Sequence, residues 1–564
     1  MDDGAAHGPR RPWEGSYPEG VDWREPIEAR PLHELVERAA SSHPRRPALR
    51  FEGQATRWED LAAAVRVAAA GLQGLGLAKG DRVGLLLPNC PAFVVAFFAS
   101  LRAGLTVVPL NPVYTPHELA AQARGTGIRV LVAPDLAAVF PKAWRLLEEG
   151  AVERLLVCPW ADMLPRGRRV LFRVSGGRGA GRVPRDPRVL RLRDLRAVAG
   201  GFVSPEIDPH HDVAVLQHTG GTSGTPKAAM LTHASLSANT VQLGRWASML
   251  RPGQERFLAV LPLFHVFALT AVLLVAAAGA QEVVLLPRFD AGRTARALAR
   301  HAVTVFAGVP TMLGAVARHR RRLRLRSLRY CVSGGAPLPA EVRAAFRERT
   351  GCDPIEGYGL TEASPVLCCE VPGGRGREGS TGLPLPGTEV EVRDPADPRR
   401  RLPPGEPGEL CARGPQVMLG YWRDPEESAS ALVDGWLRTG DLATMDEDGY
   451  VYIVDRIKDL ILVGGFNVYP RMVEEAVYAH PAVAECVVTG VSHEYLGEVP
   501  KAFVALKPGC ALTAEALSAF LAKRLSPIAR PRLIEFRDAL PRTSVGKLTR
   551  RDLAAEEHIQ GAVG

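Results

Sequence analysis

Residues 218–233 of this chain read HTGGTSGTPKAAMLTH, and this stretch is the most informative in the sequence. Three glycines, four hydroxyl residues, one proline and one lysine fill the nine positions from Thr219 to Lys227, shortly after an apolar run at 213–216 that predicts a strand. Such a loop can turn sharply, bring backbone N–H groups close to an anion, and offer hydroxyls and an ammonium to phosphate oxygens. The pattern predicts a triphosphate-binding loop, with an ordinary glycine-rich turn as the alternative. The residues concerned are Thr219, Gly220, Gly221, Thr222, Ser223, Gly224, Thr225 and Lys227.

The spacing of this loop differs from that of a P-loop. Lys227 does not follow a glycine, and Ala228 stands after it where a P-loop has Ser or Thr. The stretch is therefore a phosphate loop of another kind, or none.

Length and composition restrict the class of protein. The chain has 564 residues, too many for one hydrophobic core, which predicts two or more domains. Its hydrophobic content of 46% and charged content of 23% are typical of a soluble globular protein. Nine cysteines occur without any C-x-x-C spacing, so neither a disulfide framework nor a zinc site is expected, and a reducing cytoplasm is the natural location.

The net charge of +9 is concentrated in two arginine-rich segments. Residues 166–196 contain eleven arginines and two acids, and residues 318–329 contain seven arginines and no acid. These segments are either solvated surface or a surface that meets an anionic ligand or anionic lipid, as in a peripheral protein at the inner face of the cell membrane. Nucleic acid is not expected as a partner, because the arginines are not regularly interleaved with aromatic residues.

The sequence predicts neither a signal peptide nor a membrane span. Residues 1–30 are rich in proline, glycine and charge and lack an apolar core, which predicts a loosely held extension. Residues 257–280 form a long apolar run, but Pro262, His265 and Gly279 interrupt it. A buried strand, a turn and a buried helix explain this run better than a transmembrane helix.

Helical and strand patterns alternate from about residue 31 to residue 333, which predicts parallel sheets covered by helices. Short strands at 389–393, 408–413 and 450–453 predict a barrel-like or antiparallel segment, and two helices with three strands after Pro470 predict a compact α+β domain. The expected fold class is α/β, with an N-terminal extension at 1–30, a large domain at 31–454 and a small domain at 455–564.

Residues 357–362, GYGLTE, place a ring, a hydroxyl and a carboxylate close to two glycines, Gly357 and Gly359. Tyr358 could stack on a base, Thr361 could meet a phosphate, and Glu362 could hold Mg²⁺, which prefers oxygen ligands. The alternative is a tight turn with an exposed acid.

One further loop and three single residues give weaker signals. A loop of small residues after a predicted strand would let a flat ligand approach the end of a sheet. Asp441 could accept hydrogen bonds from two ribose hydroxyls. The alternative for the loop and for Asp441 is an ordinary turn, where small residues and Asp are common. Lys547, near the C-terminus, could reach into a distant site or only solvate a surface, and His265 lies among apolar residues, where a core histidine is the default. The small residues are Gly334, Gly335 and Ala336.

Together these clusters resemble the adenylate-forming superfamily of acyl-CoA synthetases, adenylation domains and beetle luciferases, particularly bacterial long-chain fatty-acid–CoA ligases. The resemblance runs from about residue 31 to residue 553 over seven ordered motifs. Beside the stretches already described, these motifs include residues 261–270 (LPLFHVFALT), 414–422 (GPQVMLGYW), 434–441 (DGWLRTGD) and 453–470 (IVDRIKDLILVGGFNVYP).

The resemblance implies ATP and coenzyme A as co-substrates, Mg²⁺ as the metal and a fatty acid as the acyl substrate. It implies that the loop from Thr219 to Lys227 holds the β- and γ-phosphates, that Tyr358 stacks on adenine beside the turn of small residues, and that Thr361 contacts the α-phosphate. Glu362 would then bind Mg²⁺, with the hydroxyl of Thr219 as a second metal contact.

The resemblance also assigns roles to the second half of the chain. Asp441 would hold the ribose hydroxyls with support from Arg456, and Lys547 would neutralise charge between the acyl carboxylate and the α-phosphate. Asp455 would be the hinge on which the small domain turns, and His265 with the apolar run after it would lie at the acyl site.

The predicted function is therefore formation of an acyl adenylate and transfer of the acyl group to coenzyme A. The alternatives are an adenylating enzyme that passes its acyl group to a carrier protein, a ligase for medium-chain or aryl acids, and a non-catalytic nucleotide- or lipid-binding relative. The sequence leaves the chain-length preference and the oligomeric state open, a homodimer included.

Overall fold

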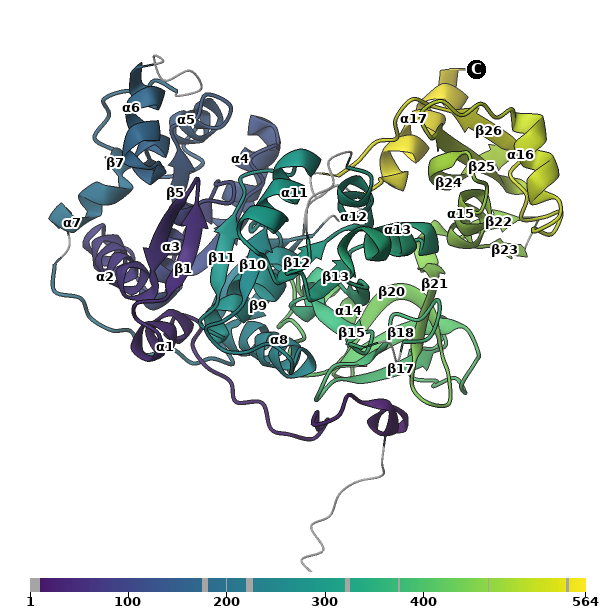
Figure 1. The fold of residues 1–564 in the computed structure, drawn as a ribbon, viewed down its shortest axis with the longest axis horizontal. Coiled ribbons are helices and arrows are strands. Elements are labelled where there is room, and N and C mark those ends of the chain that lie inside the picture. Colours follow the sequence, from purple (N-terminus) through teal and green to yellow (C-terminus); the bar gives the residue numbers. More distant parts are fainter. Residues whose placement is uncertain are drawn as a thin grey trace, which may run out of the picture.

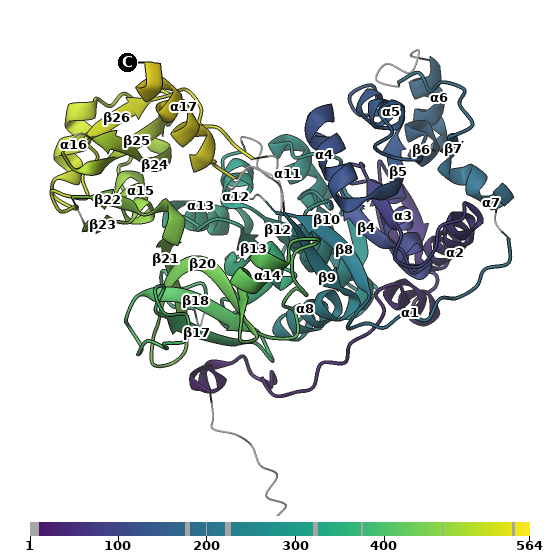
Figure 2. The ribbon, with the colours of Figure 1, turned by 180° about the vertical axis from the view of Figure 1, so that it is seen from behind.

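The structure is a computed structural model that describes residues 11–174, 181–198, 200–219, 227–319, 325–373, 376–464, 466–493, 495–543 and 547–563. A large domain carries three β-sheets, and a small C-terminal domain with a sheet of its own rests against one side of it (Figure 1). The view from behind shows the same separation between the two domains (Figure 2).

The first sheet has seven strands in the order β7-β6-β5-β3-β4-β8-β9, and every strand except β9 runs parallel to its neighbours. The central strands are almost wholly buried and apolar, as expected for a parallel sheet covered on both faces. The strands are β3 (Arg82–Leu85), β4 (Thr106–Pro109), β5 (Ile128–Pro134), β6 (Arg154–Cys158), β7 (Val189–Arg191), β8 (Val213–His218) and β9 (Ala228–Thr232), and the neighbouring helices are α1 (Glu34–Ser42), α2 (Trp58–Gly74), α3 (Pro91–Arg102), α4 (Pro116–Thr126), α5 (Phe140–Glu148), α6 (Arg166–Val174) and α7 (Leu195–Val198).

The second sheet has nine strands in the order β16-β15-β14-β13-β12-β10-β11-β1-β2, with a parallel centre and antiparallel edges at β2, β15 and β16. Its strands are β1 (Pro47–Phe51), β2 (Gln54–Arg57), β10 (Arg256–Ala259), β11 (Glu282–Leu285), β12 (Val305–Gly308), β13 (Tyr330–Gly334), β14 (Ile355–Gly359), β15 (Val366–Cys369) and β16 (Leu383–Pro384). The accompanying helices are α8 (His233–Trp246), α9 (Val266–Ala268), the π-helical turn η4 (Leu269–Leu274), α10 (Val275–Ala278), α11 (Ala291–Arg300), α12 (Pro310–Ala317), α13 (Ala340–Thr350) and the short η5 (Thr361–Ala363).

The third sheet is antiparallel, with β18 between β17 and β20, and with β19 and β21 paired to β20. The small domain has the order β23-β22-β25-β24 with β26 parallel to β25, and its buried apolar residues form a separate core. The third sheet contains β17 (Glu389–Arg393), β18 (Gly408–Arg413), β19 (Leu432–Val433), β20 (Trp436–Met445) and β21 (Val451–Arg456), with α14 (Pro425–Ala431) beside it. The small domain contains η6 (Ile457–Asp459), β22 (Ile461–Val463), β23 (Phe466–Val468), α15 (Pro470–Tyr478), β24 (Val483–His493), β25 (Gly497–Leu506), α16 (Ala514–Leu521), β26 (Leu533–Phe536) and α17 (Arg550–Val563).

The predicted fold class is confirmed. The expected alternation of strands and helices forms the two parallel-centred sheets, and the short strands expected at 389–393, 408–413 and 450–453 belong to the antiparallel sheet. The long apolar run at 257–280 folds as β10, a turn and the continuous helix α9-η4-α10, as expected. In the part of the chain that the structure describes, no helix has both the length and the apolar character needed to cross a membrane.

The N-terminal segment differs from the prediction of a loosely held extension. Residues 11–30 run along the large domain, where Trp13 and Tyr17 are buried, and the Trp23 indole donates to the Thr388 carbonyl at 3.0 Å. The ring of Tyr17 packs edge-on against Trp246, with ring centroids 5.1 Å apart. Proline and glycine content describes the local backbone but does not reveal aromatic anchors whose partners lie more than 200 residues away. Residues 1–10 lie outside the described residues.

Candidate active site

A cleft of about 2860 Å³ lies between the large and the small domain. Its walls come from the ends of β8, β13 and β14, from β20 and β21, and from the segment of the small domain that carries Lys547. Ligand sites in open α/β sheets lie at the carboxyl ends of parallel strands, so this cleft is where the fold itself places a ligand site.

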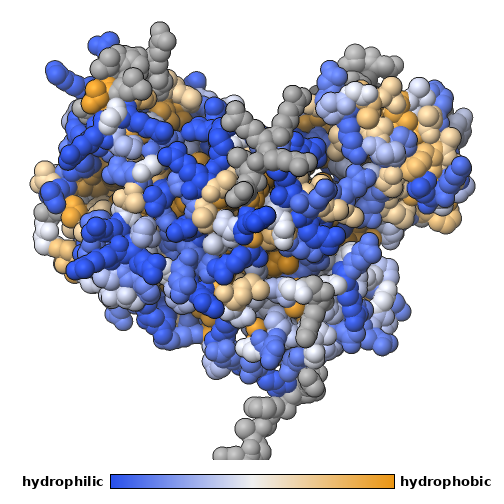
Figure 3. Space-filling view, in the orientation of Figure 1, coloured by the Kyte–Doolittle hydropathy of each residue, from blue (hydrophilic) through white to orange (hydrophobic). Residues whose placement is uncertain are grey.

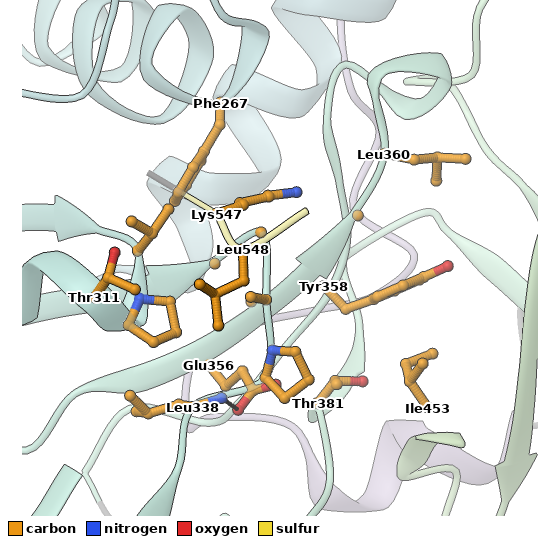
Figure 4. Close-up of a pocket in the computed structure, with 18 of the residues that line it drawn as sticks. Phe267, Thr311, Leu338, Glu356, Tyr358, Leu360, Thr381, Ile453, Lys547 and Leu548 are labelled. Carbon is orange, nitrogen blue, oxygen red and sulfur yellow. Dashed lines mark hydrogen bonds between the residues drawn. The ribbon is translucent and has the colours of Figure 1, made fainter. Parts of the chain in front are cut away.

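Lys547 enters the cleft from the small domain. Its side chain lies between Phe267 and Tyr358 (Figure 4), and its Cε packs so closely on Gly335 that a Cβ there would lie 2.5 Å away. Burial, and then repulsion from Arg456, lower the pKa of Lys547 to about 8, while Asp441 acts in the opposite direction. The structure thus places Lys547 in the cleft and not on an exposed surface.

Tyr358 and Asp441 meet across two sheets. The hydroxyl of Tyr358, at the end of β14, donates to Oδ2 of Asp441 on β20 at 2.6 Å, and Arg456 Nε lies 3.3 Å from Oδ1. Burial raises the pKa of Asp441, and Arg456 and the Tyr358 hydrogen bond oppose that rise. The carboxylate therefore stays close to two donors, in an orientation suited to accepting further hydrogen bonds from a ligand.

Glu362 follows Tyr358 after one short turn and lines the same cleft. Tyr421 donates its hydroxyl to Glu362 Oε1 at 2.8 Å, and the ammonium of Lys227 lies 5.6 Å from the centre of the Tyr421 ring and pairs with Glu427. Oε2 of Glu362 accepts no hydrogen bond from any residue that the structure describes. This carboxylate oxygen lies in the same cleft as Thr219 and Lys227 and suits Mg²⁺, which is commonly bound by one or two carboxylates together with substrate phosphates.

The base of the predicted phosphate loop is closed by a hydrogen bond of 2.8 Å from the Thr219 amide to the Lys227 carbonyl, and both residues line the cleft. The buried Nδ1 of His218, directly before the loop, has no partner within the described part of the chain. Such an unpaired atom beside a cleft is suited to a polar ligand. The other predicted loop residues, Gly220, Gly221, Thr222, Ser223, Gly224 and Thr225, lie outside the described residues.

The small residues at the ends of β13 and β14 leave a flat floor in the cleft. A Cβ on Gly334 would lie 3.0 Å from the Phe267 ring, and a Cβ on Gly359 would lie 1.9 Å from the Pro365 carbonyl oxygen. A side chain is therefore excluded at Gly359, and at Gly334 it would require the Phe267 ring to shift by a few tenths of an ångström. Gly334, Gly335, Ala336, Gly357 and Gly359 all border the cleft.

His265 caps the helix α9-η4-α10 at the apolar end of the cleft. Its Nδ1 accepts a long hydrogen bond of 3.4 Å from the Phe267 amide, so the ring proton resides on Nε2. Burial, and then the nearby charge of Lys547, lower the pKa of His265 to about 4, which keeps the ring neutral at pH 7. Beyond it the lining becomes apolar, through Val266, Ala268, Ala271, Val275, Ala247 and Leu250.

Asp455, the expected hinge, is buried where the two domains join. Its Oδ2 accepts a hydrogen bond of 2.7 Å from the Arg471 amide, and its backbone pairs with Leu442 of β20. Asp455 and Arg456 therefore still belong to the third sheet, and the chain leaves that sheet at Ile457.

Sequence reasoning missed three residues of the cleft, Tyr421, Lys458 and Glu356. Burial, and then repulsion from Arg456, lower the pKa of Lys458. Burial raises the pKa of Glu356 to about 7, and Oε2 of Glu356 accepts a hydrogen bond of 3.1 Å from the Leu338 amide (Figure 4). All three lie inside motifs that the sequence displays. Their positions in those motifs were visible, but the partners of their side chains were not.

The arginine-rich segment at 166–196 forms α6 and β7 at one corner of the large domain (Figure 1). Several of its arginines have local partners: Arg168 pairs with Glu52, Arg193 with Asp162, and Arg169 with the carbonyls of Ala161 and Asp162. Others point their side chains into solvent, namely Arg166, Arg182, Arg185, Arg191 and Arg196.

A large domain with two parallel-centred sheets, a small α+β domain and a shared cleft is the architecture of an adenylate-forming enzyme. Two family models agree with it: the AMP-binding enzyme model matches residues 36–422, and the model of the AMP-binding enzyme C-terminal domain matches residues 472–547. The chain belongs to the AMP-binding enzyme family.

Among curated proteins, the long-chain-fatty-acid–CoA ligase of Bacillus subtilis is 40% identical over 562 residues, which cover 97% of this chain and 98% of the relative. The protein of the same name from Escherichia coli O157:H7 is 38% identical over 564 residues, with the same coverage of 97% and 98%. Among solved structures, the anthranilate CoA ligase AuaEII in complex with anthranoyl-AMP matches with a TM-score of 0.83 and 26% identity, covering 96% of this chain and 100% of that one. ATP-bound MatB from Rhodopseudomonas palustris matches with a TM-score of 0.81 and 29% identity, covering 93% and 98%.

Proposed function

We propose that this enzyme joins a long-chain fatty acid to coenzyme A in two steps, through an acyl adenylate. The strongest structural support is the position of Lys547, a small-domain lysine that lies in the cleft beside Gly335 and within the field of Asp441. Relatives named long-chain-fatty-acid–CoA ligase, 35–40% identical over nearly the whole chain, support the choice of acyl substrate.

The first step needs no general base, because a fatty carboxylate with a pKa of about 4 is ionised at pH 7. A carboxylate oxygen forms a bond to the α-phosphorus of ATP while the bond to the bridging oxygen breaks, and that electron pair leaves with pyrophosphate. Repulsion between the carboxylate and the triphosphate is the main barrier. Lys547 reduces this repulsion at the α-phosphate, and Lys227 does so at the far end of the triphosphate.

Other residues of the cleft hold the nucleotide. The ring of Tyr358 presents a face to adenine, Asp441 accepts from the ribose hydroxyls beside Arg456, and Thr361 donates to the α-phosphate. Glu362 and Thr219 would hold Mg²⁺, which when bound offsets the negative charge that develops on the phosphates.

The second step requires different surroundings. The thiol sulfur of coenzyme A attacks the acyl carbon, the bond to the AMP oxygen breaks, and the thiol proton is released to solvent. Lys547 is not needed in this step and has to leave the cleft to make room for the thiol. The separate core of the small domain lets it turn as one body. Its β22–β23 hairpin exposes Leu462 (54%) and Phe466 (62%), and the small domain shows apolar colour at the upper right of Figure 3. An apolar hairpin of this kind is suited to cover the site after rotation.

The apolar branch beyond His265 suits an alkyl chain. Each CH₂ group buried there contributes about 0.8 kcal/mol, so a long chain gains affinity with every carbon that the branch accommodates. The neutral imidazole at its mouth presents an Nε2–H to the reacting carbonyl without adding a charge.

The decisive assay measures AMP and pyrophosphate release from ATP over a series of acids of increasing length, with and without coenzyme A. The proposal expects acyl-adenylate formation with long-chain acids, and AMP release that multiplies when coenzyme A is added. A preference for aryl acids, or AMP release that requires a carrier protein instead of coenzyme A, would select one of the alternatives. No acyl adenylate from any acid would end the proposal.

We also propose a peripheral contact with anionic membrane through the exposed arginines at 166–196. These side chains carry positive charge at one corner of the molecule, and anionic lipid attracts such clusters by about 1 kcal/mol per cation. Vesicles containing anionic lipid should sediment the protein at low salt and release it at high salt. Equal binding to neutral vesicles, or none at low salt, would contradict this contact.

A further inference from the structure

Arg550 is the first residue of α17 and follows Lys547 by three positions. Its guanidinium faces three carboxylates: Nη1 lies 2.8 Å from Asp459 Oδ2 and 3.6 Å from Asp455 Oδ1, and Nη2 lies 2.8 Å from Glu474 Oε1. One side chain therefore gathers acids from three separate elements at the junction of the two domains.

These three ion pairs differ in which domain supplies the acid. Asp459 and Glu474 belong to the small domain, as Arg550 does, and would move with it. Asp455 lies on β21, whose backbone pairs with β20 of the large domain. Of the three, the Arg550–Asp455 pair is the one that connects the two domains.

The segment that carries Lys547 is anchored directly at Arg550. The Thr549 amide donates to the Pro541 carbonyl at 3.0 Å, and the Thr543 amide donates to the Lys547 carbonyl at 2.7 Å, so the chain on either side of the loop is joined at two levels. Leu548 packs against the small cluster of Leu540, Phe503 and Leu553. A displacement of Arg550 is therefore transmitted to Lys547 rather than absorbed by slack chain.

The Arg550–Asp455 pair is more buried than another ion pair between the domains, which Lys507 forms with Glu341 at 3.2 Å. The side chains of Lys507 and Glu341 are 39% and 59% exposed, and exposed pairs of this kind contribute little. Those of Arg550 and Asp455 are 21% and 4% exposed, and removing one partner of a largely buried pair leaves a charge without compensation. The Arg550–Asp455 pair is the more consequential of the two.

We propose that Arg550 is a positioning residue for the first half-reaction. Its ion pair with Asp455 holds the small domain in the arrangement that delivers Lys547, and this pair opens when the small domain turns for the second half-reaction. The inference rests on the proposed function, because it requires that Lys547 serve adenylation and not thiolysis.

The test measures both half-reactions in the full-length enzyme: single-turnover formation of acyl adenylate, and thiolysis of supplied acyl adenylate by coenzyme A. Arg550→Gln should slow adenylation about tenfold, within the range of coupling between contacting charged groups, and leave thiolysis unchanged or faster. Arg550→Lys should recover part of the loss. Asp455→Asn should slow adenylation too, and the double variant should lose less than the sum of the two single effects. Lys507→Gln, which removes a cation from the exposed pair, is the matched control and should stay within about twofold in both assays.

Equal loss in both half-reactions would mean that Arg550 only maintains the fold, and additive effects of Arg550→Gln and Asp455→Asn would mean that the pair does not act as a unit. Either result overturns the inference. Failure of the proposed function is distinguishable, because it would appear in the unaltered enzyme, or in Lys547→Ala retaining full adenylation.

Discussion

The hydroxyl of Tyr358 donates a hydrogen bond of 2.6 Å to Oδ2 of Asp441, which joins the end of a strand in the nine-stranded sheet to a strand of the antiparallel sheet. Arg456 approaches the other oxygen of the same carboxylate at 3.3 Å. The carboxylate is thus oriented before any nucleotide binds, so less conformational freedom is lost when ribose hydroxyls arrive.

Tyr358→Phe removes this hydrogen bond and keeps the aromatic ring. A hydrogen bond to a charged group contributes about 1.5–3 kcal/mol, so we expect the KM for ATP to rise about tenfold while kcat changes little. Pyrophosphate exchange at varied ATP concentration measures this directly. Asp441→Asn should cost more than Tyr358→Phe, and an unchanged KM in Tyr358→Phe would show that the bond does not order the ribose site.

Glu362→Gln keeps the shape of the side chain and removes its charge. If Glu362 shares Mg²⁺ with the triphosphate, the Mg²⁺ concentration that gives half-maximal adenylation should rise about tenfold or more, because a neutral amide is a poorer ligand for this ion. Tyr421→Phe, which removes only the donor to Oε1, should produce a smaller shift in the same direction. Mg²⁺ titrations at saturating ATP provide the measurement, and superimposable curves for Glu362→Gln and the unaltered enzyme would argue against ligation.

Much of the fold could be predicted because its strands are buried on both faces and therefore appear as unbroken apolar runs, such as those of β4 and β12. The two helices and three strands expected after Pro470 correspond to α15, β24, β25, α16 and β26. The N-terminal segment could not be predicted in this way. Its order depends on Trp13, Tyr17 and Trp23 finding partners that are remote in sequence.

The candidate site shows the same division. Motifs of glycine, hydroxyl and charged residues revealed Tyr358, Asp441 and Lys547, because each chemical group stands in a recognisable local setting. The pairs Tyr421–Glu362 and Arg550–Asp455 join residues 59 and 95 positions apart, and only the assembled sheets bring them into contact. Local sequence describes which groups are present, and tertiary packing decides which of them meet.

Ala271→Phe tests the apolar branch of the cleft. Ala271 lies on the π-helical turn η4 and lines that branch, so a larger ring should shorten the space available to the alkyl chain. Each CH₂ group that is no longer buried costs about 0.8 kcal/mol, so the loss of roughly two such groups should lower kcat/KM for long acids by about tenfold or more. The kcat/KM for shorter acids should stay unchanged. Ala278→Phe, at an exposed position of the same helix, is the control. A uniform loss across all chain lengths would place the acyl chain elsewhere.

The ionisation of Lys547 predicts how the rate of adenylation changes with pH. Burial and repulsion from Arg456 lower the pKa of its ammonium to about 8, so the free enzyme loses this charge as the pH rises through 8. The pH dependence of kcat/KM reports ionisation in the free enzyme, and that of kcat reports ionisation in the substrate complex. We therefore expect kcat/KM for adenylation to be level below pH 8 and to fall above it. The fall in kcat should occur only at higher pH, because bound ATP favours the charged ammonium.

Two substitutions separate the charge of Lys547 from its shape. Lys547→Arg carries a guanidinium that stays charged across this range, so the fall above pH 8 should disappear, whatever the absolute rate. Lys547→Ala should lower adenylation by about 10²–10³, as when one preorganised donor is removed, and leave thiolysis of supplied acyl adenylate nearly intact. If the fall above pH 8 persists in Lys547→Arg, another group is responsible for the titration. An equal loss of both half-reactions in Lys547→Ala would contradict a small domain that turns between them.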